Sequence, residues 1–271
     1  MTASSAPGQL LGSVLSLARQ ASKAILDVYS TSFKVDIKTD DSPLTQADQA
    51  SHEIISRGLE KLTPDIPVLS EESPAEVHQF SNRKRWTQHW LVDPLDGTRE
   101  FINRNGEFTI NIALIRDHRP VLGVVVAPAL DLAYYAADGE GAWRLKGGDS
   151  AKPERIAVQK QARDPVLVAA SRSHRGDSLD AMLARMGRYE CKSVGSALKL
   201  CWVADGGVDL YPRLGSTSEW DTAAGQAVVE LAGGKVTDVA GETLRYNLRE
   251  SLINPHFLAF GDASRDWKGL L

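Results

Sequence analysis

The chain has 271 residues, of which 42% are hydrophobic and 24% charged, and its net charge at pH 7 is −4. This composition is typical of a globular protein long enough for two subdomains, and the acidic balance argues against a nucleic-acid polymer as a partner. No apolar run reaches the roughly 20 residues that a transmembrane helix needs, and residues 1–8 lack the features of a secretory signal. The two cysteines, Cys191 and Cys201, form no zinc-binding motif and are expected to be reduced thiols of a cytoplasmic protein.

Two helices are predicted at the start of the chain. Apolar residues at steps of three and four predict the first over residues 8–29, and the same pattern predicts the second over residues 45–62. Residues 67–69 predict a short buried strand, and the polar residues 74–88 predict a mobile loop. The inward side chains of the second helix are expected to be Ala47, Ala50, Ile54 and Leu59.

Strands are predicted to follow. The apolar residues 90–92 indicate the end of a buried strand. Alternation over residues 108–115 predicts a strand, and after a turn at 117–120 residues 121–126 are expected to pair back with it. Further strands are expected at residues 133–137 and 142–143. The first half is therefore predicted to be two helices on a mainly antiparallel sheet, with Phe108, Ile110, Ile112 and Leu114 on one face.

The second half of the chain alternates between strand and helix patterns. Residues 146–154 are rich in Gly, Lys, Asp and Pro and are the predicted subdomain boundary, which divides the chain into an α+β part, 1–150, and an α/β part, 151–271. The alternation predicts an α/β layer. Strands are expected at residues 166–170, 208–211 and 235–237, and helices at 178–186, 196–204 and 222–231.

A short acidic turn follows the apolar residues 90–92. Asp93 and Asp96 lie on a turn that Gly97 closes, so two carboxylates and free backbone N–H groups surround one point. Such a group of ligands suits a divalent cation together with a phosphate. A structural alternative is a simple turn in which Pro94 occupies the first position of a helix.

Three further acidic residues lie where apolar segments meet polar turns: Asp48, Glu71 and Asp221. Each has a structural alternative. Asp48 follows Thr45 by three residues, as in a capping box, and Asp221 is a candidate N-cap of the helix after it. Glu71 and the neighbouring Glu72 are alternatively a solvated pair. Taken together, however, these residues favour a metal site.

The three acidic segments resemble a known family. Residues 69–73 (LSEES), 90–98 (WLVDPLDGT) and 220–225 (WDTAAG) are similar, in order and spacing, to the three signatures of the inositol monophosphatase superfamily. This resemblance covers nearly the whole chain, to about Phe260. It implies a magnesium-dependent, lithium-sensitive phosphatase with the layered α-β-α-β-α sandwich of that superfamily.

Within the superfamily, the chain is most similar to the bacterial 3′(2′),5′-bisphosphate nucleotidases of the CysQ type. The segments that carry this similarity are residues 41–48, 105–115, 171–174, 195–199 and 210–213. The resemblance implies removal of the 3′-phosphate from adenosine 3′,5′-bisphosphate, which gives AMP and phosphate in sulfur assimilation. It also implies 3′-phosphoadenylyl sulfate as a second substrate. One alternative is an inositol or sugar-phosphate phosphatase, and another is a non-catalytic phosphonucleotide sensor.

The resemblance also implies a role for each acidic residue. Two Mg²⁺ ions are expected, the first held by Glu71, Asp93 and the Leu95 carbonyl. The second is expected to bind Asp93, Asp96 and Asp221, and the family is thought to use a third, weakly held ion. The expected catalytic pair is Asp48 and Thr98, which orient and deprotonate the attacking water.

Substrate contacts are implied in the same way. The N–H groups of Gly97 and Thr98 are expected to hold the reacting phosphate, next to the metal ligands. Lys199 and Arg213 are candidates for the 5′-phosphate, and Ser196 and His174 for the nucleotide. The alternatives are that Lys199 is a solvated helix residue and His174 an ordinary loop residue. Some relatives are described at the cytoplasmic face of the inner membrane, which leaves peripheral association open, and the sequence does not fix the oligomeric state.

Overall fold

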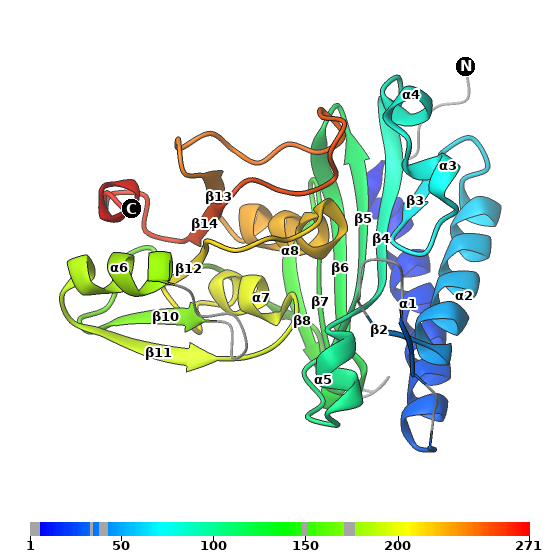
Figure 1. Ribbon diagram of the computed structural model, residues 1–271, viewed down its shortest axis with the longest axis horizontal. Helices are drawn as coiled ribbons and strands as arrows, with labels where there is room; N and C mark the ends of the chain where they lie inside the picture. The colour runs from blue at the N-terminus through cyan, green and yellow to red at the C-terminus, as the bar shows by residue number, and fades with distance from the viewer. Residues whose placement is uncertain (1–5, 33–34, 38–42, 148–150, 171–176) are drawn as a thin grey trace.

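Helices and strands lie in five layers in the computed structural model, in the order α-β-α-β-α (Figure 1). The structure describes residues 6–32, 35–37, 43–147, 151–170 and 177–271. The predicted layered fold is confirmed, since two mixed sheets alternate with three helical layers. A small hairpin of β1 (Val35–Ile37) and β2 (Pro43–Thr45) connects the first two helices.

The first layer contains α1 (Pro7–Tyr29) and α2 (Gln46–Leu62), which pack on the outer face of the larger sheet. Both helices lie where they are predicted. The expected inward face of α2 is partly wrong, because Ala50 and Ile54 are only half-buried. Most of the side chains of α2 that pack on the sheet are spaced four residues apart, as on one face of a helix. The side chains buried on it are Ala47, Asp48, Ser51, Ile55 and Leu59.

Within the described residues, the larger sheet has seven strands in the sequential order β3 to β9. All neighbours are antiparallel except β3 and β4, so the prediction of a mainly antiparallel sheet is confirmed. The short 3₁₀ helix η1 (Pro128–Leu130) lies between β6 and β7. The strands are β3 (Val68–Ser70), β4 (Gln88–Asp96), β5 (Thr109–Arg116), β6 (Arg119–Ala127), β7 (Leu132–Ala137), β8 (Gly141–Lys146) and β9 (Glu154–Arg155).

The segment between β3 and β4 differs from the prediction of an irregular loop. It forms two single-turn helices, α3 (Ala75–His78) and α4 (Phe80–Arg83). Helices of four residues leave no periodic pattern in a sequence, which explains the wrong prediction. The side chain of Arg83 is completely buried, so this polar segment is held in place by its charged residue.

The middle layer contains α7 (Leu198–Ala204) and α8 (Glu219–Leu231), and α8 packs against β5 and β6. The helix α7 begins two residues later than predicted, because Ser196 has the left-handed φ of 53°. The helix α8 begins three residues earlier than predicted. Ser218 caps it, and Asp221 completes the capping box from the third helical position.

The smaller sheet has the order β11-β10-β12-β14-β13, with parallel pairs on both sides of β10. Two of its strands were not predicted: β11 is a polar edge strand, and β14 is a short apolar run without alternation. The fifth layer contains α6 (Asp177–Met186) and the 3₁₀ helix η2 (Lys268–Leu270). The strands are β10 (Val166–Ala170), β11 (Tyr189–Ser193), β12 (Leu210–Arg213), β13 (Lys235–Asp238) and β14 (Phe257–Phe260).

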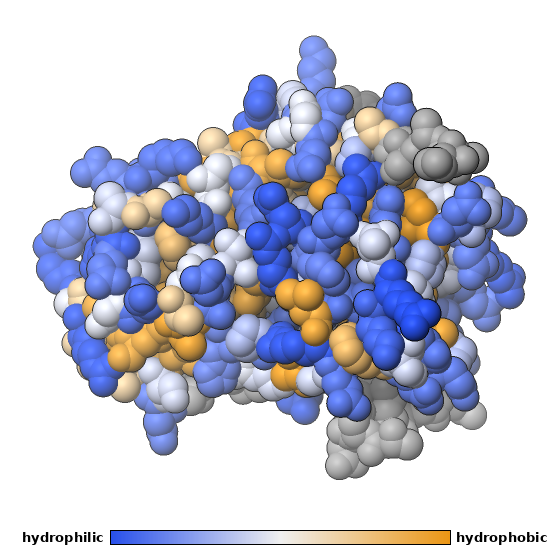
Figure 2. Space-filling model, turned by 90° about the horizontal axis from the view of Figure 1, so that it is seen from above, coloured by the Kyte–Doolittle hydropathy of each residue, from blue (hydrophilic) through white to orange (hydrophobic). Residues whose placement is uncertain are grey.

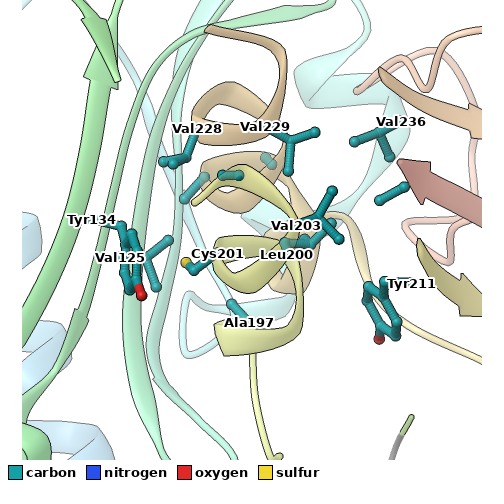
Figure 3. Packing of buried hydrophobic residues seen from close by; sticks show 14 of the residues in the cluster. Val125, Tyr134, Ala197, Leu200, Cys201, Val203, Tyr211, Val228, Val229 and Val236 are labelled. Carbon is teal, nitrogen blue, oxygen red and sulfur yellow. The ribbon is translucent and has the colours of Figure 1, made fainter. Parts of the chain in front are cut away.

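One hydrophobic core joins the two sheets through the middle layer. Figure 3 shows Val125 and Tyr134 of the larger sheet facing Cys201 of α7, while Val236 of the smaller sheet approaches from the other side. The strand β9 lies beyond residue 150 and pairs with β8 of the larger sheet. The division of the chain into two subdomains, residues 1–150 and 151–271, stays a prediction. The two parts pack extensively on each other in this shared core.

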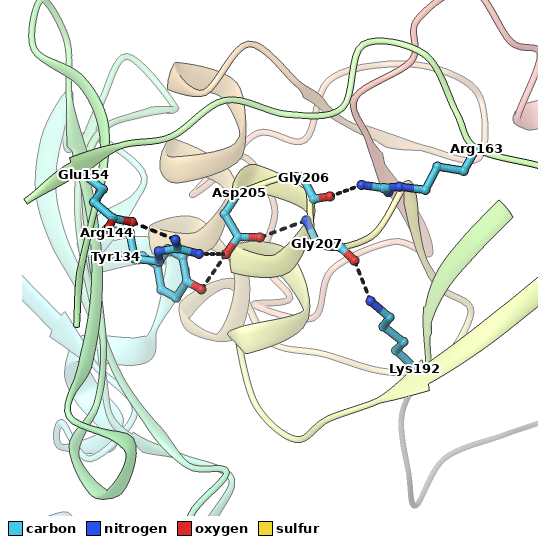
Figure 4. Close-up of polar contacts among 8 residues, drawn as sticks. All are labelled: Tyr134, Arg144, Glu154, Arg163, Lys192, Asp205, Gly206 and Gly207. Carbon is cyan, nitrogen blue, oxygen red and sulfur yellow. Dashed lines mark hydrogen bonds and ion pairs between the residues drawn. The ribbon is translucent and has the colours of Figure 1, made fainter. Parts of the chain in front are cut away.

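A polar contact also links the sheets at the end of α7 (Figure 4). Asp205 accepts hydrogen bonds from the Tyr134 hydroxyl at 2.8 Å and from Arg144 Nη1 at 3.0 Å. Arg144 also bonds Glu154 of β9 at 2.7 Å. The C-terminal end of α7 is therefore tied to β7, β8 and β9, which fixes the middle layer against the larger sheet.

We expect Gly123→Ala to destabilise the protein by about 1–3 kcal/mol, since added atoms in a packed core force the backbone to shift. An added Cβ at Gly123 of β6 would lie 2.7 Å from the Ala227 Cβ of α8, with the Ala224 carbonyl oxygen closer still. Urea unfolding measures the effect. The matched control is Gly12→Ala on the exposed face of α1, where nothing lies within 4 Å. That control is expected to raise stability by roughly 0.5–1 kcal/mol, and equal effects of the two changes would contradict the prediction.

The surface seen from above is mainly hydrophilic, with hydrophobic residues in small separate groups (Figure 2). Among the described residues, none of the helices combines the length and the apolar character that a membrane crossing requires.

Candidate active site

The predicted acidic turn lies at the end of β4. The pairing of β4 with β5 shifts register between Asp93 and Asp96, which is the signature of a bulge that redirects side chains. Asp93 is buried, and its Oδ1 accepts a hydrogen bond from the Leu95 N–H at 3.0 Å. Gly97 then has the left-handed φ of 87° and begins the short helix α5 (Thr98–Ile102). The bulge and this glycine together direct the turn toward the middle layer.

Asp96 connects the turn to the second half of the chain. Its Oδ2 accepts a hydrogen bond from the Ala197 N–H at 2.6 Å, just before α7. The same oxygen accepts longer hydrogen bonds from Asn111 Nδ2 at 3.3 Å and Thr109 Oγ1 at 3.4 Å on β5. The carboxylate is therefore fixed by β5 and by the backbone just before α7.

Glu71 and Asp221 reach the turn from different elements. Glu71 directly follows β3, whose neighbour β4 runs parallel to it, and its N–H bonds the Val92 carbonyl at 3.0 Å. Asp221 lies in the first turn of α8 and accepts a hydrogen bond from the Ser218 N–H at 2.9 Å. This bond confirms a capping role for Asp221, although Ser218 rather than Asp221 is the N-cap.

The acidic residues raise one another's pKa. Burial raises the pKa of Asp93 well above its usual value, and the nearby charges of Glu71, Asp96 and Asp221 raise it further. The pKa values of Asp96 and Asp221 are also raised, mainly by burial. Four carboxylates gathered in this way are electrostatically unfavourable unless a cation joins them.

The ligand chemistry of this group fits magnesium. Carboxylate and carbonyl oxygens are the ligands that Mg²⁺ prefers, and the Leu95 carbonyl oxygen lies on the same turn. In the described part of the chain, no three acidic, histidine or cysteine side chains lie close enough together to form a complete metal cluster. Oxygens of Asp93, Asp96 and Asp221 instead accept hydrogen bonds from backbone N–H groups. Each of these bonds uses one oxygen of a carboxylate, and the second oxygen is the one that would bind a metal.

The structure brings the predicted catalytic pair together. Thr98 Oγ1 lies 3.4 Å from both Asp48 Oδ1 and the Leu95 carbonyl oxygen, and its single proton can be donated to either. The alternative role of Asp48 is present as well, because its Oδ2 accepts from the Thr45 N–H at 2.8 Å and from Thr45 Oγ1 at 2.6 Å. One oxygen of Asp48 thus caps α2, and the other faces Thr98.

A cavity of about 330 Å³ opens beside the acidic turn. Asp96 and Asp221 line it on the side of the turn, whereas Glu71 and Asp93 are not among its lining residues. The other lining residues that bear on function are Gly97, Thr98, Arg99, Glu100, Ser196, Lys199, Tyr211, Arg213 and Phe257.

Lys199 lies in this cavity and is buried, so its interpretation as a solvated helix residue is wrong. Its Nζ donates to the Ser196 carbonyl at 2.8 Å and to the Val194 carbonyl at 3.2 Å. Burial lowers the pKa of Lys199 to about 8, although the charge of Asp96 opposes this shift. The cavity therefore contains a buried lysine whose charged form is destabilised by burial.

Two further polar groups are available to a ligand. Among the described residues, the Ser196 hydroxyl and Arg213 Nε are buried without a hydrogen-bond partner. Both side chains line the cavity, and Arg213 Nη2 bonds the Ser216 carbonyl at 2.7 Å. Unpaired buried donors are unfavourable, so these two groups indicate a polar ligand. The remaining predicted contact, His174, lies outside the described residues.

Several residues near the site were missed by sequence reasoning. Arg83 and Glu219 are completely buried in a shared network with Asn247. Glu219 directly precedes the segment 220–225, and this position in the sequence could have indicated that it lies near the site. Tyr211 lies within the segment 210–213, and its position two residues before Arg213 was the available signal for it.

A bent acidic turn, four carboxylates and a cation-lined cavity on this layered fold define the class of metal-dependent phosphatases. The profile of the inositol monophosphatase family matches residues 9–265. The chain therefore belongs to the inositol monophosphatase family.

Several relatives have high identity. The chain is 51% identical over 252 residues to the 3′(2′),5′-bisphosphate nucleotidase CysQ of Salmonella typhimurium, covering 92% of this chain and 98% of the relative. The corresponding protein of Escherichia coli K12 is 49% identical over the same shares. Among solved structures, CysQ of Bacteroides thetaiotaomicron has a TM-score of 0.81 and 41% identity, covering 94% and 97% of the two chains. The IMPase of Thermotoga maritima has a TM-score of 0.77 and 26% identity, covering 94% of each chain.

Proposed function

We propose that this protein is a 3′(2′),5′-bisphosphate nucleotidase that converts adenosine 3′,5′-bisphosphate into AMP and phosphate in sulfur assimilation. The observation that carries the proposal is the cavity, which is lined by the carboxylates Asp96 and Asp221 and by two cations, the buried Lys199 and the half-buried Arg213. A substrate with two phosphates matches this arrangement, since each phosphate has its own positive partner. The high identity to CysQ nucleotidases supports it. We extend the proposal to 3′-phosphoadenylyl sulfate as a second substrate.

The acidic residues would hold the metal. Glu71, Asp93 and the Leu95 carbonyl are the proposed ligands of one Mg²⁺, and Asp93, Asp96 and Asp221 of the other. When bound, the ions would activate a water and neutralise the charge that develops on the phosphate and the leaving oxygen. Their number, including a third ion, is part of the proposal.

The chain's own catalytic step is a proton transfer. Thr98 Oγ1 would take a proton from the attacking water as its own proton passes to Asp48 Oδ1, which already faces it. Thr45 holds the other oxygen of Asp48, so the carboxylate cannot turn away from Thr98. Gly97 leaves room for the reacting phosphate at the turn.

The remaining polar groups of the cavity would recognise the nucleotide. Lys199 and Arg213 would bind the second phosphate, because both are cationic and Arg213 Nε has no partner among the described residues. The Ser196 hydroxyl, which also lacks a partner there, would bond the ribose or the base. His174 is retained as a proposed contact on the resemblance alone.

The lowered pKa of Lys199 predicts a pH-dependent affinity. Since the free enzyme loses this charge as the pH rises through about 8, kcat/KM for adenosine 3′,5′-bisphosphate is expected to fall by about tenfold between pH 7.5 and 9.5. Bound phosphate raises the pKa of Lys199, so kcat should change less. Steady-state kinetics over this range measures both constants. In Lys199→Arg the side chain stays charged, and the fall should disappear; the same fall in both proteins would contradict the prediction.

A substrate panel tests the function directly. We expect kcat/KM in Mg²⁺ to favour adenosine 3′,5′-bisphosphate over inositol 1-phosphate, and millimolar Li⁺ to inhibit the reaction. A clear preference for the inositol ester would assign the chain to the inositol phosphatases instead. Absence of turnover with tight nucleotide binding would favour the phosphonucleotide sensor. The cytoplasmic location and the possible peripheral membrane association stay predictions.

A further inference from the structure

A completely buried arginine lies between two parts of the proposed metal site. The side chain of Arg83 lies in α4, on the segment that leads from Glu71 to β4. Its Nε donates to the His78 carbonyl at 2.9 Å, and its Nη1 to Asn247 Oδ1 at 2.7 Å. Its Nη2 donates to the Glu250 carbonyl. The guanidinium thus joins the Glu71 segment to residues 247–250, which are distant in the sequence.

Asn247 carries the link onward to α8. Its side-chain Nδ2 returns a hydrogen bond to the Arg83 carbonyl at 2.8 Å. Its own N–H bonds both carboxylate oxygens of Glu219, at 3.1 and 2.9 Å. Glu219 is completely buried and precedes Asp221 by two residues in the first turn of α8. We call Arg83, Asn247 and Glu219 the Arg83 clamp.

A second contact runs alongside the clamp. His78 Nε2 lies 2.8 Å from the Ser70 carbonyl, which only accepts hydrogen bonds, so this nitrogen carries the proton. The His78 ring centroid lies 5.5 Å from that of Trp220. Ser70 directly precedes Glu71, and Trp220 directly precedes Asp221. The clamp and the His78 contact therefore both connect the segment of one metal ligand to the segment of another.

The charges of the clamp argue for a specific role. A buried ion pair or network gives little stability relative to apolar residues of similar size, because both ions lose their water. What such a network provides is a fixed geometry, since each hydrogen bond sets a direction. The larger sheet already fixes Glu71 against Asp93 through the pairing of β3 with β4. Asp221 lies on a separate element, and the clamp holds that element.

We propose that the Arg83 clamp is a positioning device that fixes the first turn of α8 against the Glu71 segment, and so sets the affinity of the site for magnesium. This inference rests on the proposed metal ligands. Residues that orient metal ligands typically change metal affinity by about 10–100-fold when they are removed. The clamp should act through the metal and leave the contacts with the nucleotide intact.

The test is the double variant Arg83→Met/Glu219→Gln, which removes both charges and leaves no uncompensated ion in the core. We expect the dissociation constant of Mg²⁺, measured by calorimetry without substrate, to rise by about tenfold or more. The rise in unfolding temperature that Mg²⁺ produces should shrink accordingly. At saturating Mg²⁺, KM for adenosine 3′,5′-bisphosphate should remain near its original value. The single variant Arg83→Lys keeps the charge and loses the planar fork, and it should give a smaller shift in the same direction.

The matched control is a second arginine–carboxylate pair, in which the carboxylate is buried and the arginine is partly exposed. Arg163 Nη1 bonds the buried Asp209 Oδ1 at 2.8 Å, and Figure 4 shows the Arg163 side chain bonding Gly206, beyond the end of α7. The variant Arg163→Met/Asp209→Asn should lose stability without changing the Mg²⁺ constant.

Unchanged Mg²⁺ affinity in both Arg83 variants, or an equal change in the control, would show that the clamp only stabilises the fold. Calorimetry without nucleotide separates this result from a failure of the proposed substrate, which the substrate panel reports.

Discussion

Replacing Asp93 by Asn is expected to lower Mg²⁺-dependent phosphate release by more than about 100-fold, because the proposed bridging carboxylate loses its charge. The fold should remain, since an asparagine Oδ1 can still accept the Leu95 N–H that Asp93 accepts now. Stability without Mg²⁺ should be unchanged or higher. The reason is that burial and the charges of Glu71, Asp96 and Asp221 all raise the pKa of Asp93, so its ionised form opposes folding.

Two measurements check this expectation: phosphate release at several Mg²⁺ concentrations, and urea unfolding with and without the ion. In the wild type, Mg²⁺ should raise the free energy of unfolding, and in Asp93→Asn this rise should be lost. Asp205→Asn is a suitable control, because Asp205 is a partly buried carboxylate at the end of α7 that contacts Tyr134 and Arg144. It should lower stability and keep the response to Mg²⁺. Turnover of Asp93→Asn at the wild-type rate would refute the two-metal assignment.

Replacing Thr98 by Val is expected to lower kcat by about 100-fold, the usual contribution of a positioned proton-transfer group. Valine has nearly the shape of threonine but lacks the hydroxyl that faces Asp48 Oδ1. The Mg²⁺ dissociation constant should stay unchanged, since Thr98 is not a proposed metal ligand. This variant is cleaner than Asp48→Asn, because Asp48 also caps α2 through Thr45 and its replacement would lower stability too.

Thr98→Ser provides the rescue, since it restores the hydroxyl without the methyl group. Its kcat should return to within a few-fold of the wild-type value, and rapid-quench measurements would assign the defect of Thr98→Val to the chemical step. If Thr98→Val and Thr98→Ser lose activity equally, the hydroxyl has no part in proton transfer, and the role of Thr98 is to shape the turn.

The sequence was informative where the structure is local. The helix α1 follows from its own apolar stripe, and the turn at residues 93–98 lies at the predicted end of a buried strand. The pairing of Asp48 with Thr98 and the cavity position of Lys199 agree with the roles that the family resemblance implies. The prediction of the buried face of α2 was less accurate. Ile54 and Ile55 are adjacent apolar residues, and only the packing on the sheet shows that Ile55 is the buried one.

Features that depend on distant contacts could not be predicted. Arg83 lies in a polar stretch that has the composition of a loop, and the Asn247 side chain that buries it is 164 residues away. The strand β14 carries four apolar residues with no period, so only its antiparallel partners β12 and β13 define it. The buried state of Lys199 similarly depends on how α7 fits between the two sheets. In each case a partner far along the chain determines the structure.

The position of α8 also has a consequence for how the protein is made. The helix covers β5 and β6, but it is synthesised long after them, and residues 156–231 separate the end of β9 from the end of α8. At a synthesis rate of roughly 5–20 residues per second, the ribosome needs about 4–15 s to add these residues. During that time the apolar inner face of the larger sheet is not yet covered by α8. Asp221 is synthesised with that helix, so the proposed second Mg²⁺ site, unlike the proposed first, is incomplete until then. The inner face of the larger sheet therefore stays without its native cover until synthesis has passed residue 231.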